Sequence, residues 1–280
     1  METSVLSVNT KLIELKKILS EMHSIVVAYS GGVDSTFLAK VATDTLGDRA
    51  LVVTTKSPSL PEDELKSAMS IAKKNNMNHL VIETNEIKNP NYKVNNLKRC
   101  YYCKQELYQD LIKIAKDRQL KYIVNGANVD DLGDYRPGMN AANDFGVRSP
   151  LVEVSLRKVD IRLLSRELSL PTFNKPAQPC LASRIPYGKE VSVGVLSQIE
   201  QAEKYIKSLG IQVVRVRHYG ELARIEVDPI DFPILMESKS KNSLIKHFKK
   251  LGFKDVSLDL EGYRTGSLNE GKILSGELLV

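Results

Sequence analysis

Short apolar runs alternate with amphipathic segments along the first half of the chain. Each run has the length of a buried strand, and the segments between the runs carry apolar residues three and four positions apart, which predicts helices. The predicted strands cover 25–28, 50–55, 79–83 and 122–125; the predicted helices cover 5–20, 34–46, a segment opened by Pro61, and 104–117. Apolar strands separated by helices are typical of an α/β fold with a doubly wound parallel sheet.

The pattern changes between Pro171 and Pro186, where repeated prolines exclude a long helix or a central strand. Beyond this segment the chain predicts a helix over 195–209, a strand pair over 211–218 and 222–227, a helix over 240–251 and a last strand over 256–260. We therefore expect two domains, an α/β domain over 1–186 and a smaller C-terminal α+β domain over 187–280. The second would bind substrate or form an oligomer.

Composition narrows the class of protein. The chain has 280 residues, of which 42% are hydrophobic and 26% charged, as in ordinary soluble domains. No stretch approaches the roughly 18 apolar residues of a membrane helix, and the N-terminus lacks a secretory pattern, so we expect a cytoplasmic protein. A net charge of +6 suits an anionic ligand such as a nucleotide. Nucleic acid is not favoured, because the basic residues are dispersed and there is no Trp.

The strongest chemical signal is the string Ser-Gly-Gly-Val-Asp-Ser over residues 30–35, which joins the first strand directly to a helix. Gly31 and Gly32 permit backbone conformations closed to other residues, and the helix start offers free N–H groups to an anion. No Lys follows the glycines as in a Walker loop, and the G-x-G-x-x-G spacing of a dinucleotide site is absent. A simple turn capped by Asp34 is the alternative. The complete string favours a phosphate site.

This string resembles the SGGxDS signature of the PP-loop ATP pyrophosphatases, which have a Rossmann-like α/β fold. In that superfamily the loop grips pyrophosphate while the α-phosphate of ATP passes to the substrate as an adenylate. The resemblance implies ATP and Mg²⁺ as ligands. It assigns to the nucleotide the loop residues, a serine after the second strand and a glycine after the fourth, namely Ser30, Gly31, Gly32, Asp34, Ser35, Ser57 and Gly126.

Three further strings narrow the resemblance. They cover 125–138, 179–188 and 215–226, and the closing Gly262-Tyr263-Arg264 accompanies them. Together they resemble the LarE-type sulfur transferases over nearly the whole chain. The resemblance implies adenylation of a carboxylate of pyridinium-3,5-biscarboxylic acid mononucleotide, release of AMP and pyrophosphate, and formation of a thiocarboxylate for the nickel-pincer nucleotide cofactor. It also implies a homo-oligomer such as a hexamer.

The resemblance also assigns roles to polar residues outside the loop. Arg215 and Arg217 lie two positions apart on a predicted strand, so both point to one face and can fork onto a substrate phosphate. By resemblance, Ser183 and Arg184 contact a phosphate or carboxylate, Lys104 and Asp131 join Asp34 and Cys180 as catalytic residues, and Glu203 and Glu226 bind metal. For each charged residue alone, an exposed salt bridge is the alternative interpretation.

The chain has three cysteines, Cys100, Cys103 and Cys180, and this odd, low count argues against a disulfide framework. Some LarE-type proteins carry one cysteine at the position of Cys180, which gives up its sulfur and becomes dehydroalanine. The added C-x-x-C resembles the subgroup that holds a [4Fe-4S] cluster, in which three thiolates leave one iron open for exogenous sulfide. A dithiol or persulfide relay and a zinc site are the alternatives.

Rival functions make different predictions. A tRNA-thiolating PP-loop enzyme would share adenylation and cysteines, but it would bind bulk tRNA with a steep dependence on salt. An amidating synthetase leaves the cysteines without a role. A nucleotide sensor that does not catalyse a reaction would bind ATP without releasing pyrophosphate.

Overall fold

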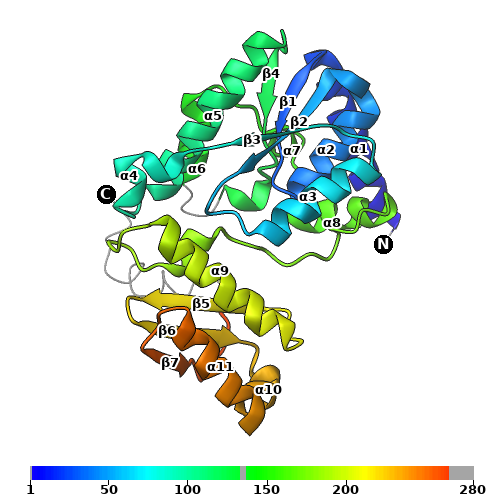
Figure 1. Ribbon diagram of the computed structural model, residues 1–280. Coiled ribbons are helices and arrows are strands. Elements are labelled where there is room, and N and C mark those ends of the chain that lie inside the picture. Colours follow the sequence, from blue (N-terminus) through cyan, green and yellow to red (C-terminus); the bar gives the residue numbers. More distant parts are fainter. Residues whose placement is uncertain (1, 133–136, 265–280) are drawn as a thin grey trace. The chain divides into compact units, whose positions relative to one another are not determined.

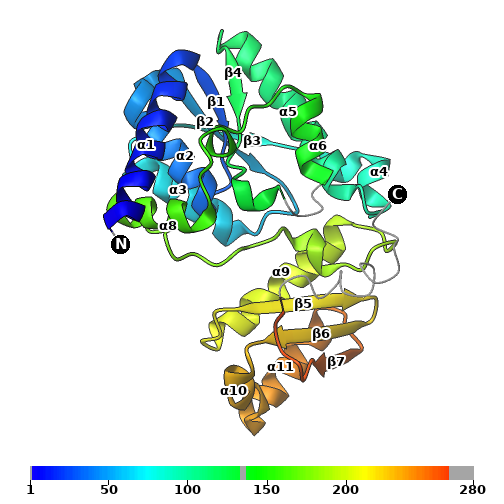
Figure 2. The same cartoon turned by 180° about the vertical axis from the view of Figure 1, so that it is seen from behind.

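The computed structural model describes residues 2–132 and 137–264 (Figures 1 and 2). The chain divides into two compact units. The first contains residues 1–86 and 100–178, and the second contains residues 87–99 and 179–280. The segment 87–99 therefore packs with the C-terminal part of the chain. Among the described residues, no helix is both long enough and apolar enough to span a bilayer.

The first unit is built on a four-stranded parallel sheet in the order β3-β2-β1-β4. Its strands are β1 (Ile25–Ala28), β2 (Ala50–Lys56), β3 (Asn78–Glu83) and β4 (Tyr122–Val124). Its helices are α1 (Glu2–Met22), α2 (Val33–Leu46), α3 (Glu62–Lys74), α5 (Arg99–Asp117), α6 (Pro137–Asp144), α7 (Pro150–Glu153) and α8 (Lys158–Glu167), with short 3-10 turns over Gly47–Arg49, Glu86–Lys88 and Val129–Asp131.

Helices cover both faces of this sheet, because successive strand residues point to opposite sides. Ile25 and Val27 pack in one apolar cluster with residues of α1, α2 and α8, whereas Val26 packs in another with residues of α5 and α6. Figure 1 shows α1 and α2 on one side of the strands and α5 on the other. The predicted α/β fold with a doubly wound parallel sheet is confirmed.

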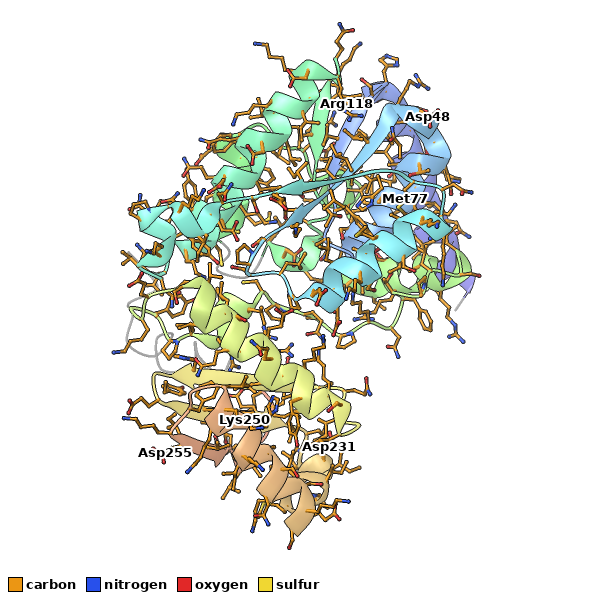
Figure 3. All side chains as sticks on the ribbon, viewed as in Figure 1. Asp48, Met77, Arg118, Asp231, Lys250 and Asp255 are labelled. Atoms are coloured by element: carbon orange, nitrogen blue, oxygen red, sulfur yellow. The ribbon has the colours of Figure 1, made fainter. Side chains whose placement is uncertain are left out.

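The second unit contains a three-stranded sheet in the order β5-β6-β7. β5 (Val214–Tyr219) and β6 (Leu222–Val227) form the predicted antiparallel pair, and β7 (Asp255–Leu258) pairs parallel to β6. The helices are α4 (Pro90–Lys93), α9 (Val193–Ser208), α10 (Phe232–Met236) and α11 (Ser238–Lys250), with 3-10 turns over Leu181–Arg184 and Pro229–Asp231. Apolar residues of α9, α11 and the strands form one core. Lys250, at the end of α11, and Asp255, at the start of β7, are exposed and are labelled in Figure 3.

Two differences from the predicted elements bear on chemistry. The helix expected from residue 104 begins at Arg99, so Cys100 and Cys103 lie in its first turn and not in a loop. The sequence pattern also missed α8, a short helix whose start is fixed by Asp160, since its carboxylate accepts from the backbone N–H of Arg157 (3.1 Å). The Pro-rich segment contains no long helix or strand, as predicted.

We expect Gly126→Ala to destabilise the first unit. A methyl group at residue 126 would lie 2.8 Å from the backbone nitrogen of Ser35, and backbone cannot yield as a side-chain tip can. Overpacking of this kind costs about 1–3 kcal/mol, measurable by urea unfolding. Gly194→Ala is the control, because its new methyl would meet nothing closer than 4.0 Å. Equal stability of the two variants would contradict the close approach.

Candidate active site

The loop 30–35 lies at a topological switch point of the parallel sheet. β1 is flanked by β2 on one side and β4 on the other, so the connections that leave β1 and β4 diverge at their carboxyl ends. Ligands of open α/β sheets bind at this kind of position. The first of these connections is the loop 30–35, and the second carries Gly126 and the polar residues Asn128, Asp130 and Asp131.

Backbone and hydroxyl groups give the loop its shape. The Ser30 and Ser35 hydroxyl oxygens lie 3.0 Å apart, and the Ser35 hydroxyl donates to the carbonyl of Gly32 (3.3 Å). Gly31 adopts a φ of +72°, and a side chain there would strike Ala68 of α3 at 2.8 Å. The structure thus brings together the predicted residues Ser30, Gly31, Gly32, Ser35 and Gly126.

Asp34 is the acidic residue of the loop and forms an ion pair with Lys158, the first residue of α8. The other oxygen of this carboxylate, Oδ1, is buried and has no hydrogen-bond partner among the described residues. A buried carboxylate oxygen without a donor is costly unless a ligand completes its coordination. Asp34 therefore has one oxygen committed to a cation and one available to a second positive group.

The residues after β4 hold Lys158 in place. The Asp130 carboxylate accepts from the Lys158 backbone N–H (2.7 Å) and from the Arg157 guanidinium (2.9 Å), and these bonds hold the pKa of Asp130 below its usual value. The predicted catalytic residue Asp131 accepts from the backbone N–H of Asn128 (3.0 Å), and the Asn128 side chain accepts from the Asp130 N–H (2.9 Å). In this structure Asp131 therefore shapes the turn that presents Asp130.

Lys175 is a second lysine at the loop. Its ammonium group donates to the carbonyl of Gly31 (3.1 Å) and to Glu64 of α3 (2.6 Å). The sequence analysis missed both Lys158 and Lys175, because each lies far along the chain from residues 30–35. One local signal exists for Lys158: a cation in the first turn of a helix opposes the helix dipole, so it needs an anionic partner elsewhere.

Ser57, predicted on the adenine side, follows β2. Its hydroxyl donates to Glu86, which is only 1% exposed, and it accepts from the backbone N–H of Ser59 (3.0 Å). Nearby, Glu106 accepts from the backbone N–H of Asn85 (2.9 Å), and burial raises the pKa of the Glu106 carboxyl. The turn after β2 is thus closed by a buried carboxylate, Glu86, that the sequence analysis did not single out.

α5 carries three more predicted residues. Cys100 and Cys103 are not in a disulfide and lie three positions apart on the helix, a spacing that places them on one face; Cys100 is exposed and Cys103 partly buried. Lys104 lies beside Gly138, where an added methyl group would approach its side chain to 3.2 Å. Within the described ranges, no three His, Cys, Asp or Glu residues gather as a metal site. Cys180 belongs to the other unit, so the cluster stays a prediction.

In the second unit, Arg184 is almost fully buried beside Cys180. Its Nε and Nη2 donate to the two carboxylate oxygens of Glu203 (2.9 and 3.0 Å). Its Nη1 lies within hydrogen-bond distance of the carbonyls of Pro179 (2.6 Å) and Cys180 (3.0 Å) and of the Ser183 hydroxyl (3.0 Å). The guanidinium predicted to bind a ligand therefore holds the cysteine loop in this structure.

Arg215 and Arg217 of β5 are both buried, as their shared strand face predicts. Arg217 donates to Glu226 (2.9 Å) and to the carbonyl of Ser183 (2.9 Å). Arg215 lies over the ring of Tyr263 at 5.1 Å, and burial, followed by the charge of Arg184, lowers its pKa. The predicted residues Ser183, Arg184, Arg215, Arg217, Glu203 and Glu226 are gathered in this unit. A metal at either glutamate would have to displace a guanidinium from an oxygen or share that oxygen with it.

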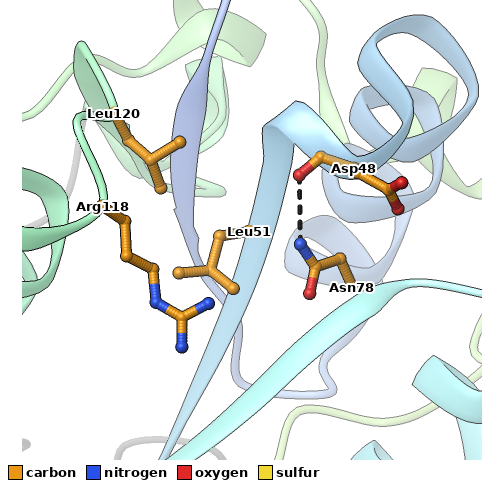
Figure 4. Close-up of a pocket in the computed structure, with 5 residues that line it drawn as sticks. All are labelled: Asp48, Leu51, Asn78, Arg118 and Leu120. Carbon is orange, nitrogen blue, oxygen red and sulfur yellow. Dashed lines mark hydrogen bonds between the residues drawn. The ribbon is translucent and has the colours of Figure 1, made fainter.

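A cavity of about 340 Å³ lies at the opposite edge of the first unit's sheet. Arg118 and Leu120 line it on one side of Leu51, and Asp48 and Asn78 line it on the other, joined by a hydrogen bond of 3.0 Å (Figures 3 and 4). These residues lie at the amino ends of β2, β3 and β4. The cavity is therefore separate from the loop 30–35.

Comparison with known proteins finds relatives whose sequences match both units of the chain. Residues 6–106 match the NAD synthase family. The chain is 35% identical over 265 residues to the pyridinium-3,5-bisthiocarboxylic acid mononucleotide synthase of Lactiplantibacillus plantarum, covering 93% of this chain and 94% of that protein. It is 45% identical to an uncharacterized protein of Synechocystis (93% and 97% covered) and 34% identical to one of Methanocaldococcus jannaschii (91% and 98% covered).

Residues 133–136 of the string 125–138 lie outside the described residues, and so does the chain beyond 264. None of the predicted site residues lies in these ranges, so the structure describes all of them, Asp131 included.

We expect Lys158→Met to weaken ATP binding by about tenfold or more. Without the ammonium group, the Asp34 carboxylate stands uncompensated at the loop and repels phosphate oxygens, and a charge-assisted hydrogen bond of this kind is worth about 1.5–3 kcal/mol. Titration calorimetry with ATP measures the effect. Lys113→Met is the control, because its ammonium group is exposed and pairs with Asp110 on the surface of α5 (3.3 Å). An unchanged affinity of Lys158→Met would show that Lys158 does not serve the loop.

Proposed function

The chain belongs to the family of LarE-type sulfur transferases of the PP-loop superfamily, and on this premise we propose that it is an ATP-dependent sulfur transferase. The resemblance found in the sequence motifs is confirmed by the match to the Lactiplantibacillus plantarum synthase along nearly the whole of both chains. The proposed substrate is pyridinium-3,5-biscarboxylic acid mononucleotide. The proposed product is a thiocarboxylate used in nickel-pincer nucleotide biosynthesis.

ATP with Mg²⁺ fits the loop 30–35. The loop supplies the start of α2 and two hydroxyl groups for phosphate oxygens, and Lys158 and Lys175 supply positive charge. The buried, unpartnered Oδ1 of Asp34 has the hard-oxygen chemistry that Mg²⁺ prefers. Mg²⁺ held there would neutralise charge on the phosphates during transfer. The glycines leave the backbone free to approach the phosphates.

The proposed first step balances without an oxidant. An oxygen of the substrate carboxylate attacks the α-phosphorus of ATP, a carboxyl–phosphate bond forms, and the bond to the β-phosphate oxygen breaks. Pyrophosphate leaves with the electron pair of that bond and stays held by the loop and its lysines. The acyl adenylate that results is an activated electrophile, because AMP is a far better leaving group than an oxide.

In the proposed second step, sulfur at the sulfide level attacks the acyl carbon and AMP departs, which yields the thiocarboxylate and one proton. Three free thiols are a suitable donor set for a [4Fe-4S] cluster. When bound by Cys100, Cys103 and Cys180, such a cluster would supply one open iron position for exogenous sulfide. In the alternative route, Cys180 itself attacks as thiolate and then loses its sulfur by elimination, leaving dehydroalanine.

The second unit is suited to an anionic substrate. Arg215 and Arg217 are buried on one strand face, Arg217 contacts the carbonyl of Ser183, and paired guanidinium groups bind phosphate oxygens with defined geometry. We propose that these arginines bind the phosphate of the mononucleotide. Lys104 and Asp131 remain proposed catalytic residues, Glu203 and Glu226 proposed metal ligands, and the homo-oligomer a proposed assembly.

The loop geometry with its unpartnered Asp34 oxygen is the observation that carries this proposal, so Asp34 provides its test. We expect Asp34→Asn to lower pyrophosphate release from ATP and substrate by about a hundredfold or more, because the neutral amide cannot hold Mg²⁺ or balance Lys158. Asp44→Asn is the matched control on α2, since its carboxylate pairs with Lys40 on an exposed turn. Full activity of Asp34→Asn would refute the nucleotide assignment.

Iron analysis tests the cysteines. After anaerobic reconstitution with iron and sulfide, we expect about four irons per chain, lost when any one of the three cysteines is replaced by Ala. Cys180→Ala should stop thiocarboxylate formation and spare pyrophosphate release. An active protein without iron would exclude the cluster, and a mass loss of one hydrogen sulfide at Cys180 after turnover would identify the sacrificial route.

A further inference from the structure

The loop from Pro179 to Lys189, which carries Cys180, is held mainly through its carbonyl groups. Seven of its backbone oxygens lie within hydrogen-bond distance of side-chain N–H groups of Asn95, Arg99, Arg184 and Arg217. The segment makes no strand ladder, so its buried carbonyls need such donors. The position of Cys180 therefore depends on these four side chains, and two of them, Asn95 and Arg99, have no role in the proposed chemistry.

Asn95 makes the largest share of these bonds. It is completely buried, and its Nδ2 donates to the carbonyls of Pro186 (2.9 Å) and Lys189 (2.9 Å). The carbonyl of Ile185 is a further, longer acceptor of the same amide group (3.3 Å). Its own carbonyl accepts from the backbone N–H of Gly188 (2.9 Å). Asn95 has a φ of +56°, a conformation that asparagine tolerates better than most residues.

Arg99 completes the network. Its Nη1 donates to the Oδ1 of Asn95 (2.5 Å) and to the carbonyl of Ala182 (2.9 Å), and its guanidinium lies 5.6 Å from the centre of the Tyr187 ring. These contacts fix which end of the Asn95 amide faces the loop. Arg99 is also the first residue of α5 and the residue directly before Cys100 in the chain.

We propose that Asn95 and Arg99 are positioning residues for sulfur delivery, a role that rests on the proposed function. Their side chains bind the backbone of the loop that carries Cys180 and so fix its position. Arg99 also directly precedes Cys100 in the chain. The cysteine-bearing loop and the segment that leads into the C-x-x-C are thereby joined by one buried side chain. Sulfur transfer depends on this contact, since a misplacement of about 1 Å can cost roughly a hundredfold in rate. Adenylation at the loop 30–35 does not depend on it.

The test compares Arg99→Met with Arg99→Lys in the full chain. We expect Arg99→Met to lower thiocarboxylate formation by about tenfold or more while pyrophosphate release stays within about twofold of the wild type. Arg99→Lys keeps a charged donor for Ala182 or Asn95 and should restore part of the loss. Alkylation of Cys180 in the apo protein, followed by mass spectrometry of its peptide, should accelerate about tenfold in Arg99→Met, with Cys103 unchanged.

Lys93→Gln is the matched control. Lys93 and Glu190 form an exposed ion pair of 3.0 Å between the same two segments, so its loss removes a surface link and leaves the buried network intact. Exposed pairs contribute little, and we expect wild-type values in all three measurements.

Two results would overturn the proposal: an unchanged Cys180 alkylation rate in Arg99→Met, or an equal fall of pyrophosphate release and thiocarboxylate formation. If Arg99→Met fails to fold, Asn95→Asp decides the question, because it keeps the size of the side chain and removes the donors to Pro186 and Lys189. Failure of the wild type to form a thiocarboxylate would refute the proposed function instead, and the alkylation rates would still test the positioning role.

Discussion

The divergence of the connections that leave β1 and β4 is the constraint on which the candidate active site depends. Parallel strands end at one edge of a sheet, and only where neighbouring connections turn to opposite faces does that edge open for a ligand. Here the loop 30–35 enters α2, which packs on one face of the sheet, and the connection after β4 leads into α6, which packs on the other. Asp130 then holds the start of α8, which brings Lys158 to Asp34.

Local patterns carried much of this information. The string 30–35 predicted the loop because glycine conformations, hydroxyl donors and a helix start are all properties of consecutive residues. The spacing of Arg215 and Arg217 predicted a shared face, because strand side chains alternate. The four parallel strands followed from apolar runs that sheets buried on both faces require.

What the sequence could not supply are contacts between residues far apart along the chain. Lys158 reaches Asp34 across 124 positions, and Lys175 reaches the carbonyl of Gly31 across 144. Neither contact produces a periodic pattern in the sequence, because each depends on how α8 and the segment after it fold back to the loop. Arg184 shows the same limit in another form: the family resemblance implied a ligand contact, whereas in the structure its guanidinium binds Glu203 and the backbone at Cys180.

The loop 30–35 and its neighbour Gly126 include positions where no side chain fits. At Gly31 and Gly126 an added methyl group would lie 2.8 Å from Ala68 or from the backbone of Ser35, so at these two positions the surface of the loop is formed by main chain. A larger residue at either glycine would have to displace α3 or the start of α2. A change of substrate would therefore have to arise from residues other than these glycines, and under the proposed function the ATP site would stay the same when the substrate changes.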